Sequence, residues 1–245
     1  MIPAAHGPVA LASQDSTGLP FVAEMYGLQH DQLGALLGLT ARQTRALTGR
    51  WVRAGFAETG VLSQGPAWVW LTRSGLQATG ARYAPTPPAL ARLAHLRAVT
   101  AVRLALESVD AYRDGLAHWR SERHLRARLS GKLGARDHLP DAEVHWPDTP
   151  GQAPAWAGEC WAIEVELTPK TVARTTAIMR EILTRTGDYG CPAAEAAVPG
   201  GPPRHARALY LCSPAALTTV LNARALLGPL SARIEVRDLP PGAQP

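Results

Sequence analysis

The stretch Cys160-Trp-Ala-Ile-Glu-Val-Glu-Leu-Thr-Pro-Lys170 decides the fold of the C-terminal part of the chain. Within it, three aliphatic residues alternate with Glu164 and Glu166. Successive side chains of a β-strand point to opposite faces, so this period of two places both carboxylates on one face. The pair Thr168-Pro169 is typical of a helix start, as N-cap and first helical residue. We therefore predict a strand that leads directly into a helix.

Helices and strands alternate on both sides of this stretch, which is the pattern of an α/β domain. Strands are predicted over about 115–119, 140–144, 206–212 and 232–236, and helices over about 88–112, 122–129, 169–186 and 214–227. The segment 191–204 is rich in Pro, Gly and Ala and is predicted to be a surface loop.

The sequence Pro85-Thr-Pro-Pro88 interrupts all periodicity, because three prolines in four residues cannot continue a helix. We place a linker there, over residues 85–88. It separates a first domain over 17–84 from a second over 89–239. Residues 1–16 and 240–245 are predicted to be tails, the first of them disordered.

The first domain begins with three short amphipathic segments, over about 19–26, 31–37 and 41–54. Gly38 is placed to end the second helix and Thr40 to cap the third, which makes a tight turn between them. A hairpin over about 57–71 follows, with its tip at 63–66, and then a short helix begins near Arg73.

This order of elements resembles the winged helix-turn-helix superfamily over about residues 19–80. Such folds place the third helix in the major groove of double-stranded DNA. With Leu47, Trp51 and Val52 predicted to face inward, the resemblance implies base contacts from Arg42, Gln43 and Arg45, and backbone contacts from Arg50, Arg53 and Gln64. The alternative is a winged helix used for dimerisation or protein contact, its arginines only solvating a surface.

Acidic residues in the second domain suggest a Mg²⁺ site. Asp141 follows Pro140 at a predicted strand start, and Glu164 and Glu166 share a strand face. Hard cations take carboxylate oxygens, water and substrate phosphate as ligands. The alternative is that the glutamates cover a solvated edge strand and that Pro140-Asp141 is an ordinary turn.

The order helix, three strands, helix, strand, together with these acids, looks like the PD-(D/E)XK nuclease superfamily, a restriction-endonuclease-like α/β fold with a central mixed sheet. The resemblance implies Asp141 and Glu164 as metal ligands. The third position, usually Lys, is Glu166 here, which leaves Lys170 to reach back as a substitute. A further acid is expected from Glu122 or Glu107, with Glu122 preferred.

Over residues 19–239 the chain resembles the actinobacterial replication-relaxation family, through 95–103 (H-L-R-A-V-T-A-V-R), 119–122, 140–141, 163–171 (I-E-V-E-L-T-P-K-T) and 209–213. The resemblance implies DNA binding at a plasmid or integrated mobile element, in replication or conjugal mobilisation. Two functions stay open: a Mg²⁺-dependent DNA endonuclease, or a non-catalytic transcriptional regulator or relaxosome accessory factor. A regulator that senses a small ligand in its C-terminal domain is a third hypothesis, which no nucleotide-binding glycine motif supports.

Composition is compatible with a nucleic-acid-binding protein but does not identify one. The 245 residues carry a formal charge of +5, a mild basic excess that is compatible with a polyanionic partner. Nearly all the basic residues are arginine, which together with the abundant Ala, Gly and Pro looks like the codon bias of a GC-rich genome. The number of arginines is therefore no evidence of phosphate binding. No basic-then-apolar leader and no long apolar run is found, so we expect a cytoplasmic protein without membrane contact. Besides DNA, a second copy of the chain and replication or relaxase proteins are expected partners.

Overall fold

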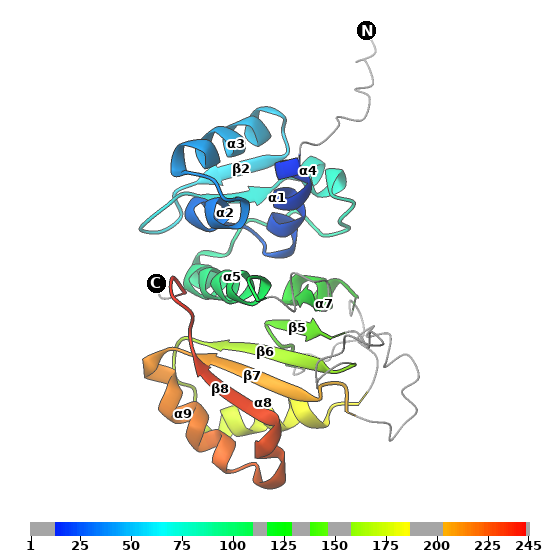
Figure 1. Cartoon of the computed structure of the whole chain (residues 1–245), viewed down its shortest axis with the longest axis vertical. Coiled ribbons are helices and arrows are strands. Elements are labelled where there is room, and N and C mark those ends of the chain that lie inside the picture. The colour runs from blue at the N-terminus through cyan, green and yellow to red at the C-terminus, as the bar shows by residue number, and fades with distance from the viewer. Residues whose placement is uncertain (1–12, 110–116, 129–137, 147–157, 187–202, 244–245) are drawn as a thin grey trace. The chain divides into compact units, whose positions relative to one another are not determined.

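The computed structural model describes residues 13–109, 117–128, 138–146, 158–186 and 203–243. The chain divides into two compact units, Met1–Leu90 and Ala91–Pro245, and each is described by itself. The predicted mixture of helices with a central mixed sheet is confirmed (Figure 1). Within the described residues, no helix combines the length and the apolar character needed to cross a membrane.

Over residues 13–90, the N-terminal unit combines four helices with a small antiparallel sheet of order β1-β3-β2. Its elements are α1 (Ser13–Glu24), β1 (Leu28–Gln29), α2 (His30–Leu37), α3 (Ala41–Arg53), β2 (Ala57–Gly60), β3 (Trp68–Leu71) and α4 (Arg73–Ala78). The two-residue strand β1 was not predicted, because a segment this short shows no periodicity. The hairpin β2–β3 agrees with the sequence pattern.

Local signals fix the turn between α2 and α3. Gly38 takes the left-handed conformation, with φ at 64°, and ends α2. Thr40 caps α3 through a reciprocal capping box, in which its hydroxyl accepts from the Gln43 N–H and the Gln43 side chain accepts from the Thr40 N–H. Gly75 is required for a different reason, since a Cβ atom there would lie 1.9 Å from the Phe56 carbonyl oxygen.

Two expectations for this unit were wrong. The helix α1 begins at Ser13, inside the expected tail, because Asp15 is buried and accepts a hydrogen bond from Trp51 Nε1 at 2.7 Å. Val52 was expected in the core but is 42% exposed. Thr44 and Thr48 are buried instead, each bonding a backbone carbonyl one turn earlier.

The C-terminal unit is built on a five-stranded sheet of order β4-β5-β6-β7-β8. Strand β5 pairs antiparallel with both β4 and β6, and β6, β7 and β8 run parallel. Its elements are α5 (Leu93–Glu107), β4 (His118–Ser121), α7 (Glu122–Arg128), β5 (Ala142–His145), β6 (Cys160–Glu166), α8 (Val172–Thr184), β7 (Arg207–Cys212), α9 (Pro214–Ala225) and β8 (Ile234–Asp238). The 3-10 turns η1 (Leu90–Arg92) and η3 (Gly228–Arg233) precede α5 and β8.

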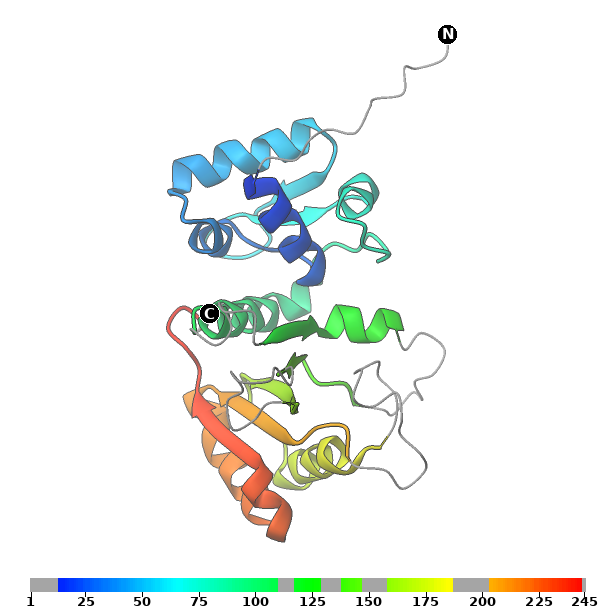
Figure 2. The ribbon, with the colours of Figure 1, turned by 45° about the vertical axis from the view of Figure 1, so that its right-hand side comes forward.

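The sheet of this unit is covered on both faces. Helices α8 and α9 lie on one face and α5 on the other (Figure 1), and β4 continues directly into α7 (Figure 2). The core under α8 and α9 includes Ala162, Met179 and Tyr210. Because β6 is the central strand, its glutamates are buried as well, with Glu164 2% and Glu166 4% exposed. The alternative of a solvated edge strand is therefore wrong.

Other boundaries shift for local reasons. Helix α8 begins at Val172, capped by the Thr171 hydroxyl, and not at Thr168-Pro169. Arg204, expected in a surface loop, is fully buried. The rest of that loop, 191–202, lies outside the described residues. The expected tail after Leu239 is ordered as far as Ala243, which is buried and donates its N–H to the Pro240 carbonyl.

Candidate functional site

Three predicted acids meet at the carboxyl end of the central strand β6. Glu164 and Glu166 share the face of Tyr210, which pairs with Glu164 across to β7. Asp141 immediately precedes β5, whose amino end lies beside the carboxyl end of β6 because the two strands are antiparallel. The Val165 N–H donates to Asp141 Oδ2 at 2.8 Å, which joins Asp141 directly to the strand that carries the glutamates.

Two histidines hold the carboxylates in place. His95 Nε2, near the start of α5, lies 2.7 Å from Asp141 Oδ1. His138 Nε2 lies 2.7 Å from Glu164 Oε1. Sequence reasoning assigned no role to either histidine. For His95 a signal was present, since it is a polar residue between Leu93 and Leu96 on the buried side of α5.

Lys170 completes the cluster. Its ammonium group forms an ion pair with the Glu166 carboxylate, from the connection between β6 and α8. The side chain of Lys170 is 33% exposed, whereas that of Glu166 is 6% exposed. Lys170, which lies outside the strand, thus brings its charge to Glu166, as the sequence required if Lys170 was to take part.

The carboxylates influence one another strongly. Burial, followed by the charges of Asp141 and Glu166, raises the pKa of Glu164 to about 7 in spite of its bond to His138. Burial would also raise the pKa of Asp141, but His95 and the Val165 N–H outweigh it and the pKa is lowered. Burial and the charges of the three carboxylates raise the pKa of Tyr210 well above its usual value. The site therefore holds several carboxylates close together and shielded from solvent.

Of the two further acids predicted, Glu122 lies beside the cluster and Glu107 lies away from it. The Glu122 N–H donates to the Asp141 carbonyl at 2.9 Å, which places Glu122 beside the cluster. Its two carboxylate oxygens are bound by Arg92 and Arg126, each at 2.6 Å. Glu107 pairs with Arg103 and lies twelve residues beyond His95 on α5, or about 18 Å along the helix axis. Glu122 thus supports the site through its backbone, while its carboxylate is already neutralised.

Asp141 and Glu164 suit a hard divalent cation. Each offers carboxylate oxygens, which keep lone pairs beyond those that the histidines and the Val165 N–H occupy. A cation would also relieve the repulsion that raises the pKa of Glu164. The hydroxyl of Tyr210 is buried next to this charge and has no hydrogen-bond partner among the described residues. These residues fit Mg²⁺ chemically, although nothing in the structure identifies the ion.

A second buried cluster brings metal-type ligands closer together. Within the described part of the chain, Glu143, Cys160 and His205 are the group whose three ligand atoms lie within 4.8 Å of one another. Both oxygens of Glu143 are already bound by the Arg204 guanidinium, and His205 Nε2 lies 2.7 Å from one of them. A guanidinium in this position opposes a second cation, so we interpret the cluster as a structural ion pair.

The predicted DNA-contacting residues of the N-terminal unit differ in their exposure and in the bonds that they make within the unit. Arg42, Arg45 and Arg53 are exposed on α3. Gln43 is exposed too, but its side-chain oxygen is used by the capping box. Gln64 lies exposed at the tip of the β2–β3 hairpin.

Arg50 is engaged within the unit. Its guanidinium pairs with Asp15 at 2.6 Å while its side chain remains 50% exposed. The hairpin between Ala57 and Leu71 contains no arginine or lysine, and its charged residue is Glu58. Of the six arginines in residues 13–90, four lie on α3, and the other two are Arg73 and Arg82.

Comparison with known proteins gives no family assignment: no protein-family model matches this chain, and no curated protein matches it either.

Proposed function

We propose that this chain binds double-stranded DNA through its N-terminal unit and hydrolyses phosphodiester bonds with Mg²⁺ at the acidic cluster of its C-terminal unit. One observation carries the proposal: Asp141, from the start of β5, is joined to the strand that carries Glu164 and Glu166, and Lys170 pairs with Glu166. Scattered acids would have argued for three unrelated surface groups.

The C-terminal topology supports a nuclease-like fold. Apart from the short helix α7 between β4 and β5, the order α5, β4, β5, β6, α8, β7 gives three antiparallel strands followed by a helix and a parallel strand. This is the order that the resemblance to the PD-(D/E)XK superfamily implies. Asp141 lies at the start of the second of these strands and Glu164 on the third, as that resemblance requires.

The N-terminal unit supports a winged helix-turn-helix. Helix α2, the turn at Gly38 and helix α3 precede the antiparallel hairpin β2–β3, which would be the wing. The exposed face of α3 carries Arg42, Arg45 and Arg53 and no acidic residue. Arginine can bind guanine through two hydrogen bonds or pair with phosphate, so this face suits a DNA groove.

The chemistry of the cluster is assigned residue by residue. Asp141 and Glu164 would hold the cation, which when bound supplies an acidified water and neutralises phosphate charge. Glu166 lies next to them and would accept a proton from the attacking water. The Lys170 ammonium would hold the Glu166 carboxylate in place and stabilise charge on the phosphate. His95 and His138 orient the two ligand carboxylates.

A non-catalytic DNA-binding factor is the second candidate function, and one observation favours it. His95 and His138 each bond one oxygen of the carboxylates that would bind the metal. Protonated, these histidines supply positive charge where a cation would lie. In that case the acidic cluster would be an internally neutralised remnant of a metal site.

A cleavage experiment separates the two candidates. Supercoiled DNA is incubated with the full chain in Mg²⁺, in Mn²⁺ and in EDTA. The variants are Asp141→Asn, with Glu107→Gln as a control outside the site. Metal-dependent nicking that is lost in Asp141→Asn and kept in Glu107→Gln supports hydrolysis. Tight binding in a mobility-shift assay, without nicking in either metal, supports the non-catalytic factor.

On the resemblance to the replication-relaxation family alone, we propose a plasmid or integrated mobile element as the context. Replication or relaxase proteins and a second copy of the chain would be the protein partners. Co-purification of the chain with a relaxase from a mobilising host tests this, and it is independent of cleavage.

A further inference from the structure

Two arginines meet on one carboxylate beside the acidic cluster. Arg92 Nη2 donates to Glu122 Oε2 at 2.6 Å. Arg126 donates to Glu122 Oε1 through Nε at 2.9 Å and through Nη2 at 2.6 Å. Arg92 is the last residue of η1, whereas Glu122 and Arg126 belong to α7. Because both guanidinium groups bond the same carboxylate, they converge on one point from two separate elements.

This point lies on the accessible side of the acidic cluster. The Glu122 N–H donates to the Asp141 carbonyl, and Arg92 lies three residues before His95, whose Nε2 contacts Asp141. Burial lowers the pKa of His95, the bond to Asp141 outweighs this effect, and the nearby charge of Arg92 opposes the rise. The side chains of His95 and Asp141 are 27% and 14% exposed, whereas that of Glu164 is 3% exposed. A substrate would therefore reach the cluster from the side on which the two arginines lie.

The cationic groups of this network lie on the outside. The Glu122 side chain is 11% exposed, whereas those of Arg92 and Arg126 are 40% and 53% exposed. Two guanidinium groups share one carboxylate, so the three side chains together carry one net positive charge. Within the described part of the chain, Arg126 Nη1 has no hydrogen-bond partner. Guanidinium N–H groups in this planar arrangement match the oxygens of a phosphate.

Stabilisation of the fold alone gives little reason for a second guanidinium on Glu122. Exposed ion pairs contribute only about 0–1 kcal/mol to stability, and two like charges that share one counter-ion also repel each other. A phosphate bound by Arg92 and Arg126 would supply the negative charge that the network lacks.

We propose that Arg92 and Arg126, which we call the arginine clamp, bind one phosphate of the DNA backbone next to the phosphodiester bond that is cut. This inference rests on the proposed function, because it names the part of the substrate that is held beside the acidic cluster. Glu122 is the positioning residue of the clamp, since it holds both guanidinium groups and does not itself contact DNA. Phosphate contacts carry no base sequence, so the arginine clamp would orient the strand and leave sequence recognition to α3.

DNA binding in EDTA tests the arginine clamp without metal-dependent cleavage. Fluorescence anisotropy is measured on the full chain with a labelled duplex oligonucleotide as the probe, over a range of salt concentrations. The test variant is Arg92→Gln with Arg126→Gln. Because this double variant leaves Glu122 without its counter-charges, a triple variant adds Glu122→Gln and removes the whole ion pair network. Circular dichroism and thermal melting establish which variants are folded.

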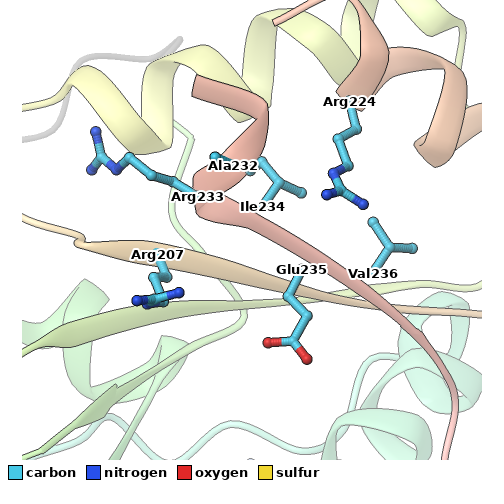
Figure 3. A pocket seen from close by; sticks show the side chains of 7 residues that line it. All are labelled: Arg207, Arg224, Ala232, Arg233, Ile234, Glu235 and Val236. Atoms are coloured by element: carbon cyan, nitrogen blue, oxygen red, sulfur yellow. The ribbon is translucent and has the colours of Figure 1, made fainter. Parts of the chain in front are cut away.

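Arg207→Gln is the matched control, because Arg207 is also an exposed arginine that is paired with a glutamate. Arg207 is the first residue of β7 (Figure 3). It is in register with Trp161, five residues before Glu166 on β6, which corresponds to about 17 Å along the strand. The control thus removes one positive charge from the same unit at a distance from the arginine clamp.

We expect the double and triple variants to bind DNA about tenfold more weakly for each arginine removed. The slope of log affinity against log salt should decrease by about 0.9 for each lost phosphate contact. Arg207→Gln should bind like the wild type. In Mg²⁺, the KM for cleavage should rise by a similar factor with kcat nearly unchanged, because a phosphate beside the scissile bond is held equally in the ground state and in the transition state.

The outcomes separate the arginine clamp from the hydrolysis that it would serve. Loss of affinity in the clamp variants, together with no cleavage by the wild type, supports the clamp as a DNA contact and removes hydrolysis from the proposed function. Cleavage by the wild type, with affinity, salt slope and KM unchanged in both clamp variants, overturns the clamp and leaves hydrolysis standing. An equal loss in Arg207→Gln also overturns the clamp, because the effect would then be one of net charge. Absence of DNA binding by the wild type overturns both.

Discussion

The Lys170 ammonium group forms an ion pair with the Glu166 carboxylate from four residues further along the chain, beyond the end of β6. The strand position that usually holds a lysine in the family resembled here is thus acidic, while a cation is supplied from the following connection. If the cluster hydrolyses DNA, Glu166 and Lys170 would together take the role that a single lysine usually has in that family. Each side chain can be tested separately.

Replacing Lys170 by Met should lower the rate of Mg²⁺-dependent cleavage by about 10²- to 10³-fold, the typical effect of losing one group that stabilises transition-state charge. The DNA affinity should stay unchanged, because the proposed reader is α3 in the other unit. Single-turnover cleavage and a mobility-shift assay measure the two quantities. Lys170→Arg, which keeps the charge, should recover part of the rate. Equal rates for Lys170→Met and wild type would remove Lys170 from the mechanism.

Replacing Glu164 by Gln should abolish cleavage and stabilise the metal-free protein. The folded protein holds a proton on Glu164 up to a pKa of about 7, so its contribution to stability is lost as the pH rises from the ordinary carboxyl range through 7. A neutral amide removes this cost, which is at most about 3 kcal/mol above pH 7 and vanishes near pH 4. Urea unfolding in EDTA at several pH values measures the difference.

Glu107→Gln is the matched control for that experiment, because its carboxylate is also ion-paired but lies outside the cluster. It should leave cleavage unchanged and change stability by less than about 1 kcal/mol. A Glu164→Gln protein that is less stable than wild type above pH 7 would mean that the bond to His138 outweighs the repulsion among the carboxylates.

The parts of the fold that sequence predicted are those fixed by local rules. Alternation located β6, and the Gly38 and Thr40 signals located the ends of α2 and α3, because each depends on residues a few positions apart. The reciprocal use of Gln43 in the capping box was missed, although Thr40-x-x-Gln43 is its usual pattern. Gln43 had instead been assigned to DNA.

Contacts between distant residues could not be predicted in the same way. His95 and Asp141 are 46 residues apart, and Arg204 and Glu143 are 61 apart. Their pairing depends on the order and direction of the strands, which periodicity does not reveal. Convergence of the three acids was expected from their chemistry as ligands of a hard cation and from the resemblance to a nuclease fold, whereas the part played by the histidines follows from the geometry.

Replacing Glu143 by Gln should destabilise the C-terminal unit by about 3–5 kcal/mol, because it leaves the buried Arg204 guanidinium without its counter-charge. His205 and Arg204 overcome the effect of burial and lower the pKa of Glu143 to about 2. The wild-type pair therefore contributes fully above the ordinary carboxyl pKa, and this contribution is lost as the pH falls toward 2. The variant should show a flatter acid limb in urea unfolding. A loss of stability below 1 kcal/mol would mean that the pair is not buried in solution.

Variants of the α3 arginines should lose DNA affinity, whereas a variant of the cap residue Gln43 should lose stability. Arg42→Ala and Arg45→Ala should each weaken DNA binding by about tenfold or more without changing stability, since both side chains are exposed. Gln43→Ala should lower the stability of the N-terminal unit by about 1 kcal/mol through loss of the capping box. Fluorescence anisotropy over a range of salt concentrations and thermal unfolding provide the two measurements.

Arg237→Ala is the control, because it changes the net charge equally from the other unit and should leave the affinity for DNA nearly unchanged. If Arg42→Ala and Arg45→Ala bind DNA like the wild type at every salt concentration, α3 is not the reader and the winged-helix proposal fails.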